Sequence, residues 1–209
     1  MQGSLSVLAR ARTVLGRLLV VVGLSIGVAV AHAPGAVAQT IPARPAFASP
    51  FTCGQVWFAR TYAGHPTFAI DWNLPGSSEA DYGQPVLAGV SGVVTVALNS
   101  GYGLMVTIDH GDGWSTLYAH LSAASVATGD RVTPATLVGA VGHSGHADSS
   151  HLHQEQQFNG VRQPILVDGH TVDATFSSRG ASYASANCPP LAHKWRAPWR
   201  TAGRGISKW

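Results

Sequence analysis

The sequence has few cysteines, few charged residues and no long helical pattern, and each shortage narrows what the chain can be. Cys53 and Cys188 are the only cysteines among 209 residues, and neither lies in a recognisable nucleophile motif. Charged residues make up 11% of the chain. No segment after residue 38 has a long, clean helical period. The motif HExxH is absent, which excludes the common helical zinc-protease arrangement, and GxSxG is absent as well.

The first 38 residues have the layout of a secretory signal peptide. Arginines at positions 10, 12 and 17 precede the apolar run LLVVVGLSIGVAV, and small residues follow it at cleavage spacing. This run of 13 residues is short for a membrane span, which needs about 20. We therefore expect cleavage after Ala38, a secreted protein, and no membrane contact after cleavage. An uncleaved membrane anchor is the alternative.

The basic charge of the chain is concentrated at its two ends. Of 13 basic residues, three precede the cleavage site and five lie in the tail KWRAPWRTAGRGISKW at 194–209. Residues 39–193 hold five basic and ten acidic residues, so the charge balance gives no argument for nucleic acid. Three tryptophans interleave with the basic residues of the tail, which suits an anionic cell-wall polymer. The alternative is a tail that is partly disordered or packs its tryptophans on the domain.

Strand-like segments dominate the body of the chain. GLMVTIDHGDGWSTLYAHL places two strand-like runs around Gly111-Asp112-Gly113, which is a hairpin signal. We expect one compact, mostly β, antiparallel domain. The expected divisions are the signal peptide at 1–38, a Pro- and Ala-rich linker at 39–50, the domain at 51–175 and an extension at 176–209. Residues 174–187 are small and polar and are expected to form a loop.

The two cysteines flank most of the predicted domain. Export makes a disulfide between Cys53 and Cys188 chemically reasonable, and such a bond would tie the ends of the domain together. Two free thiols are the alternative.

The segment SSHLHQEQ at 149–156 places two imidazoles on either side of one leucine. Side chains alternate between faces along a strand, so His151 and His153 project to one side and Leu152 to the other, where it can anchor the strand. His65 and Asp71 in GHPTFAID, and His120 in TLYAHL, are further candidates. Zinc in hydrolytic enzymes commonly takes three such ligands and keeps one position for water. Five residues can supply three ligands and two helpers, but spacing alone does not divide the roles.

Four segments occur in an order that resembles the lysostaphin/LytM-type zinc endopeptidases of bacterial cell walls. They are GHPTFAID, GLMVTIDHGDGWSTLYAHLS, GDRVTPATLVGAVGHSG and HLHQEQ, and the resemblance covers residues 53–168. It implies a compact, mostly antiparallel β fold with a groove over one sheet, one zinc ion, and cleavage of peptide bonds in peptidoglycan at the cell wall.

Carried over to this sequence, the resemblance assigns roles to five residues. His65, Asp71 and His153 match the zinc ligands. His120 and His151 match the two catalytic histidines that act on the water and on the transition-state charge. Which of them is the base and which the stabiliser stays open.

The sequence departs from the family pattern at two places, and two nearby residues have weaker assignments. Five residues separate His65 from Asp71 where the family has three, and Gln154 stands where the family has an apolar residue. Tyr62 is a candidate for oxyanion stabilisation. Glu155 lies on the face of the two histidines, which favours a hydrogen bond to a ligand over a role as base.

The sequence therefore predicts a secreted, monomeric zinc metallopeptidase that hydrolyses peptidoglycan peptides. The alternatives are a non-catalytic module of the same fold that binds the wall or regulates a hydrolase, and a secreted peptidase with a protein substrate. All five site positions are filled, which favours the enzyme. The bond that is cut is not specified by the sequence.

Overall fold

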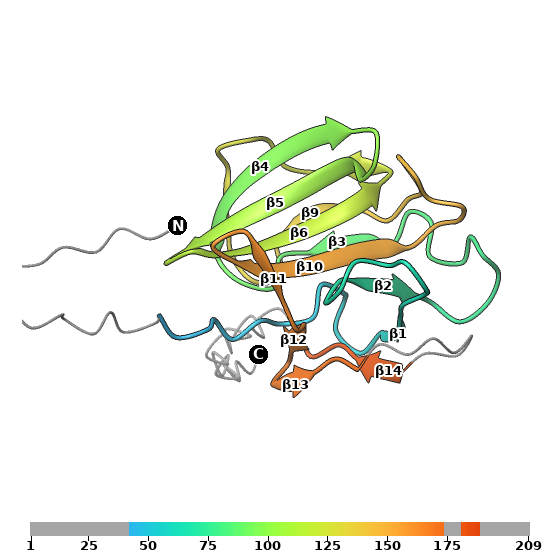
Figure 1. The fold of residues 1–209 in the computed structure, drawn as a ribbon, viewed down its shortest axis with the longest axis horizontal. Coiled ribbons are helices and arrows are strands. Elements are labelled where there is room, and N and C mark those ends of the chain that lie inside the picture. Colours follow the sequence, from blue (N-terminus) through green and yellow to red (C-terminus); the bar gives the residue numbers. More distant parts are fainter. Residues whose placement is uncertain (1–41, 174–180, 189–209) are drawn as a thin grey trace, which may run out of the picture. The chain divides into compact units, whose positions relative to one another are not determined.

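The computed structural model describes residues 42–173 and 181–188, which form strands joined by turns. Every pairing between these strands is antiparallel, so the predicted mostly β, antiparallel fold is confirmed. The two ranges contain no helix that could span a membrane. In chain order (Figure 1) the strands are β1 (Val56–Arg60), β2 (Ile70–Asn73), β3 (Pro85–Leu87), β4 (Gly92–Asn99), β5 (Gly103–Gly111), β6 (Trp114–Leu121), β7 (Ala123–Ala124), β8 (Arg131–Val132), β9 (Leu137–Ala140), β10 (Leu152–Phe158), β11 (Val161–Gln163), β12 (Leu166–Val167), β13 (His170–Thr171) and β14 (Ala181–Ala184).

One large sheet carries all the strands on which the candidate residues lie. Its order is β14-β1-β2-β10-β6-β5-β4-β8, and β11 pairs with β10. Three strands form a second sheet in the order β3-β9-β7, and β12 pairs with β13. β10, which begins within the HLH segment, lies between β2 and β6 (Figure 1). It is therefore flanked by the strand that contains Asp71 and the strand that contains His120.

The hairpin predicted around Gly111-Asp112-Gly113 joins β5 to β6. All three residues have positive φ, with Asp112 at 50° and each glycine at 82°. This left-handed backbone is strained for most residues but is tolerated by glycine and aspartate, which explains the composition of the turn.

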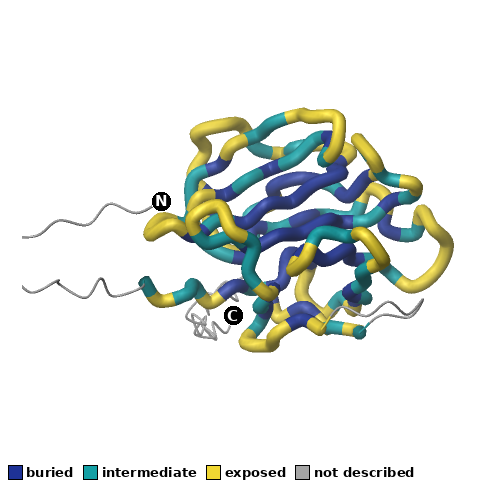
Figure 2. The backbone as a smooth tube through the Cα atoms, viewed as in Figure 1, coloured by how far each residue is buried: buried dark blue, intermediate teal, exposed yellow. Residues whose placement is uncertain are grey.

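The hydrophobic core joins the large sheet to the three-stranded sheet. Trp57, Trp72 and Leu152 of the large sheet are fully buried, as are Val86 of β3 and Val138 of β9, and all five belong to one cluster. Figure 2 shows the central strands as buried and the turns between them as exposed. Leu152 thus anchors β10 in the core, as the sequence predicts, and the opposite face of β10 is free to carry a site.

The segment before β1, predicted as a linker at 39–50, packs on the domain where the structure describes it. Phe47 is 3% exposed, and its ring contacts the ring of Trp114 with centroids 6.1 Å apart. The backbone of Ala48 donates a hydrogen bond to Gly89, and Leu87 donates one to Pro50. This segment is therefore part of the domain's packed surface.

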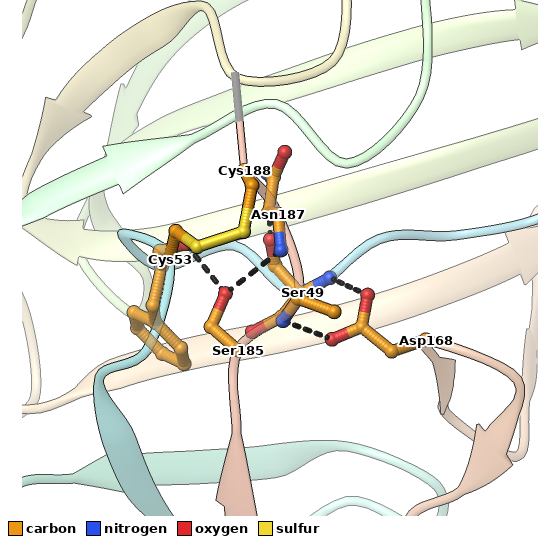
Figure 3. Close-up of a disulfide and its surroundings, with 8 residues drawn as sticks. Ser49, Cys53, Asp168, Ser185, Asn187 and Cys188 are labelled. Carbon is orange, nitrogen blue, oxygen red and sulfur yellow. Dashed lines mark hydrogen bonds between the residues drawn. A yellow bond between two sulfur atoms is a disulfide. The ribbon is translucent and has the colours of Figure 1, made fainter. Parts of the chain in front are cut away.

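A disulfide joins Cys53 to Cys188, across 135 positions of sequence. Figure 3 shows the polar contacts around it. The side chain of Asn187 donates hydrogen bonds to the carbonyls of Ser49 and Ala88, at 2.8 and 3.1 Å. Asp168 accepts one from the backbone of Ser49 and one from the backbone of Ala186. These bonds hold the segment before β1 and the segment after β14 together.

The loop expected at 174–187 is corrected by the structure over its second half. Ala181–Ala184 forms β14, which pairs with β1 at the edge of the large sheet. Tyr183 packs its ring edge against Trp72, with centroids 5.7 Å apart. Pairing with β1 and this contact outweigh the weak strand propensity of the small residues. The predicted signal peptide and the tail at 194–209 lie outside the described residues.

Candidate metal centre and groove

Asp71 and His153 are placed side by side by the register of two neighbouring strands. Asp71 of β2 lies directly opposite His153 of β10. Residues directly opposite each other in an antiparallel pair project from the same face of the sheet. Both side chains therefore lie on the face opposite Leu152, where His65 joins them from the loop that precedes β2.

The Oδ1 atom of Asp71 lies at the centre of this cluster. It accepts hydrogen bonds from Nε2 of His65 at 3.1 Å and from Nδ1 of His153 at 2.9 Å. The three donor atoms all lie within 4.8 Å of one another. Burial acts to raise the pKa of Asp71, but the hydrogen bonds from His153 and His65 outweigh it and hold the pKa well below its usual value. Two imidazole nitrogens and an ionised carboxylate fit a zinc ion.

The wide gap between His65 and Asp71 is accommodated by a turn. Ala69 donates a backbone hydrogen bond to Pro66, and Phe68 has a φ of 63° with its side chain half exposed. The extra residues therefore bulge outward at Phe68. Both His65 and Asp71 keep their side chains in the cluster, where they are 1% and 11% exposed.

A buried carboxylate orients His153 from the side away from Asp71. Glu155, fully buried, accepts a hydrogen bond from Nε2 of His153 at 3.2 Å, as the sequence predicts. Glu155 also accepts one from the hydroxyl of Tyr102 at 2.7 Å and lies 2.7 Å from Nε of Arg162. Burial raises the pKa of Glu155, but these partners and Gln157 overcome it and lower the pKa to about 2. Burial lowers the pKa of His153, but the hydrogen bonds to Asp71 and Glu155 outweigh it and raise the pKa. Because Glu155 holds the proton on Nε2, Nδ1 is the nitrogen that would exchange its proton for a metal ion.

His120 and His151 flank the cluster and are oriented in the same way. Nδ1 of His120 donates to the carbonyl of Ser144 at 2.8 Å, and Nδ1 of His151 donates to that of Ser149 at 3.0 Å. In the neutral form of each ring, the proton on Nδ1 leaves Nε2 unprotonated. The two rings are 4.7 Å apart between centroids, and Nε2 of His151 lies 3.7 Å from Oδ1 of Asp71. All five residues selected from the sequence are thus brought together.

Comparison with known proteins identifies the same family of peptidases that the sequence resembles. The model of peptidase family M23 matches residues 77–164, a range that contains His120, His151 and His153. The chain carries an M23 peptidase domain. His65 and Asp71 precede the matched range, so their inclusion in the site comes from the geometry described above.

Curated M23 relatives are longer than this chain. The DD-carboxypeptidase/endopeptidase Mpg of Neisseria meningitidis serogroup B is 45% identical over 124 residues, which is 57% of this chain and 28% of that protein. The peptidoglycan DD-endopeptidase ShyA of Vibrio cholerae is 38% identical over 93 residues, 44% of this chain and 20% of that protein. The chain thus spans less than a third of the length of either relative.

A solved M23 structure has the same fold. Pseudoalterin, described as a novel M23 metalloprotease from the deep sea, aligns with a TM-score of 0.53 at 23% identity. The alignment covers 66% of this chain and 86% of that one. At this identity the likeness concerns the fold.

The backbone of the M23 domain is strained at His120. Its φ is 60°, in the left-handed region that a histidine seldom adopts, which costs on the order of 1–3 kcal/mol. Burial, reinforced by the neighbouring His151 and His153, lowers the pKa of His120 to about 4, although the hydrogen bond that His120 donates to the carbonyl of Ser144 acts to raise it. The ring is therefore neutral at physiological pH and can accept a proton or a hydrogen bond at Nε2.

The carbonyl that holds His120 is itself fixed by close packing between glycines. A Cβ on Gly103 would lie 2.3 Å from the carbonyl carbon of Ser144, and one on Gly145 would lie 2.3 Å from the nitrogen of Gly103. The hydroxyl of Ser144 accepts a hydrogen bond from Leu104 and donates one to Leu121, at 2.9 and 2.7 Å. Ser144 is thus locked against β5 and β6.

A groove of about 750 Å³ opens beside the cluster. It is lined by Asp71 and His151, by Tyr62 on one side, and by the loop 145–149. Tyr62 is 58% exposed and its ring lies 4.8 Å from that of His65. This position leaves its predicted role in oxyanion stabilisation open to test. His146 also lines the groove.

Three functional partners were not found from the sequence. Tyr102 bonds to Glu155 across 53 positions of sequence, and Ser144 bonds to His120 across 24. Arg162 pairs with Glu155 from the neighbouring strand β11. None lies in a motif with a fixed spacing to the histidines. No sequence signal short of the fold would have selected them.

Proposed function

We propose that this chain is an exported zinc metalloendopeptidase that hydrolyses peptide bonds of bacterial peptidoglycan. The observation that carries the proposal is the convergence of His65, Asp71 and His153 beside two further histidines, His120 and His151, at the edge of an open groove. The relatives ShyA and ShyC of Vibrio cholerae are named as peptidoglycan DD-endopeptidases, which supports this choice of substrate.

His65, Asp71 and His153 would hold the zinc ion through Nε2, Oδ1 and Nδ1. When bound, zinc lowers the pKa of a water molecule and polarises the scissile carbonyl. Glu155 keeps His153 in the required orientation by accepting a hydrogen bond from its other nitrogen.

His120 and His151 would divide the proton transfer and the stabilisation of charge between them. Each presents a free Nε2, because its Nδ1 proton is held by a backbone carbonyl. One Nε2 can accept the proton of the attacking water and return it to the leaving amine. The other, once protonated, can donate a hydrogen bond to the negative oxygen of the tetrahedral intermediate. Both histidines have the geometry for either role, so the base and the stabiliser are not assigned to particular residues.

The test uses chain 39–209 with intact peptidoglycan, with a chelator and with zinc restored. Mass spectrometry identifies the new amino and carboxyl ends. We expect cleavage that the chelator abolishes and zinc restores, and loss of at least about 100-fold in rate for His151→Ala. The matched control is His170→Ala, on the exposed strand β13, which should retain full activity.

Two outcomes would redirect the proposal. Retention on peptidoglycan without zinc-dependent cleavage would favour the non-catalytic wall-binding or regulatory module. Equal cleavage by His151→Ala and the parent protein would contradict the role of His151.

A further inference from the structure

Arg60 is aligned with two of the proposed zinc ligands. It is the last residue of β1 and lies directly opposite Asp71 of β2, which in turn lies opposite His153 of β10. The three residues form one row across three strands, and residues in such a row share a face of the sheet. Adjacent strands are about 5 Å apart, so the backbone of Arg60 is one strand away from Asp71.

The side chain of Arg60 borders the groove that opens beside the site. Arg60 lines this groove together with Asp71, Asn73 and His151. A second carboxylate, that of Asp148, lines the groove from the loop 145–149. The groove that contains Asp71 and His151 is thus also lined by an arginine of β1.

Within the described residues, Arg60 has no carboxylate within 4.0 Å, and its buried Nε atom has no hydrogen-bond partner. Two other arginines of the domain have partners. The Nε atoms of Arg44 and Arg162 are also buried without a hydrogen-bond partner, but Nη2 of Arg44 donates to Gln156 and to the carbonyl of Pro164. Nη2 of Arg162 donates to Tyr102, and its guanidinium pairs with Glu155. A buried donor without a partner is costly, and a charged one more so. Arg60 therefore has hydrogen-bonding capacity that the folded domain does not use.

We propose that Arg60 binds a free carboxylate of the substrate, carried by a residue that forms the scissile bond. This inference rests on the proposed peptidase function and specifies its substrate class. A guanidinium binds a carboxylate through two parallel hydrogen bonds, which fixes orientation as well as adding affinity. A residue that follows the cleaved bond carries such a carboxylate when it ends a chain or when its side chain forms the link.

The inference separates two classes of substrate. Peptides cut next to a free carboxylate should be favoured, whether the carboxylate ends a linear chain or belongs to a cross-linking residue. Bridges of uncharged residues without a nearby carboxylate should be poor substrates. The Asp148 carboxylate in the same groove would add repulsion on its own side and so direct the substrate carboxylate towards β1.

The experiment compares two peptides of one sequence, ending in D-alanyl-D-alanine with either a free carboxylate or a carboxamide. The zinc-loaded protein should cleave the carboxylate form with a kcat/KM about 10- to 100-fold higher. Arg60→Met should lower kcat/KM for the carboxylate form by a similar factor and leave the carboxamide form unchanged. Arg60→Lys should recover part of the loss. Arg131→Met, an exposed arginine on β8, is the matched control.

Failure of this inference differs from failure of the proposed function. An active parent protein that cleaves both peptides equally, or an Arg60→Met variant that keeps the preference, would overturn the role of Arg60 alone. A parent protein that cleaves neither peptide nor peptidoglycan would overturn the peptidase function.

Two further measurements complete the test: the affinity for the carboxylate peptide, and the cleavage of a cross-linked peptide dimer. In the His120→Ala background, which prevents turnover, the Kd of the carboxylate peptide should rise about 10-fold or more with Arg60→Met. An unchanged Kd would contradict the inference even if no peptide is cut. A cross-linked dimer, with its linking residue amidated or not, then tells whether the carboxylate is that of a chain end or of a link.

Discussion

Asp71 is the side chain around which the other candidate residues are arranged. It contacts His65, His151 and His153 through a single oxygen. An ionised carboxylate in this position compensates the burial of the imidazoles and attracts a cation. The properties of the site therefore depend on the groups that hold those imidazoles in place.

Glu155→Gln is expected to weaken zinc binding by about 10- to 100-fold while the protein stays folded. Glutamine keeps the size of the side chain but removes the negative charge that orients His153 and balances Arg162. Zinc affinity is measured by competition with a chelating dye. Asp112→Asn, at the exposed hairpin turn, serves as the control. Equal zinc affinity in both variants would show that Glu155 does not support the site.

His120→Asn is expected to reduce the loss of stability in acid. The pKa of His120 falls from 6.5 to about 4 on folding, chiefly through burial, so the unfolded chain takes up a proton first as the pH falls. The free energy of unfolding therefore decreases between about pH 6.5 and pH 4. Asparagine does not titrate and tolerates the positive φ at this position.

Urea unfolding of the metal-free proteins at pH 7.5 and pH 4.5 measures this difference. The parent protein should lose more stability than the variant over that interval. The same loss in both proteins would mean that His120 does not titrate as its burial requires.

At the scale of elements, β10 and the loop before it carry the chemistry while neighbouring strands hold them. β10 brings His153 between β2 and β6, and the segment 142–151 supplies the carbonyls that orient both flanking histidines. Ser144 connects this segment to β5 and β6. The backbone of Ser144 lies so close to Gly103 that a Cβ atom would not fit between them, and this close approach determines the position of Ser144.

Gly103→Ala is expected to lower peptidase activity by about 10- to 100-fold, since small displacements of catalytic groups have effects of this size. The new Cβ would meet the backbone of Ser144 and push away the carbonyl that orients His120. Gly129→Ala is the matched control, because Gly129 also has positive φ but has open space around it. Equal activity of the two variants would exclude this route to His120.

The sequence predicts the proposed zinc ligands better than it predicts the residues that hold those ligands in place. Alternation around Leu152 predicts that His151 and His153 share a face, and both contact Asp71. Local spacing is sufficient there because the strand period is short. Tyr102 reaches Glu155 across 53 positions of sequence through the pairing of β5, β6 and β10, which no local pattern reports. Arg162 reaches Glu155 from β11, the strand paired with β10, but nothing in the local pattern marks it as a partner of Glu155. β14 was missed for the same reason, since its pairing with β1 overrides its composition.

At the scale of the whole molecule, the two ends of the described domain are joined by a covalent bond and by polar contacts. The disulfide between Cys53 and Cys188 lies beside the hydrogen bonds of Asn187 and Asp168 (Figure 3). The residues of the candidate site all lie between the two cysteines. The stability of the folded site therefore depends on the disulfide and the hydrogen bonds that join the two ends of the domain.

Replacing both cysteines by serine is expected to lower the free energy of unfolding by about 5 kcal/mol, the chain-entropy value for a separation of 135 residues. Urea unfolding of the parent protein and the variant measures the difference. A reductant should destabilise the parent protein to a similar degree and have no effect on the variant. Unchanged stability after both treatments would show that the polar contacts alone close the domain.

The disulfide also makes the chain between its two cysteines a covalently closed ring. A protease that nicks the exposed hairpin turn at Asp112 would open this ring without releasing a fragment. The part with His65 and Asp71 would stay tethered to the part with His120 and His153. A chain cut once at this turn would thus keep its site assembled. A chain rearranged to begin at that turn, with its old ends joined, would have the same connectivity.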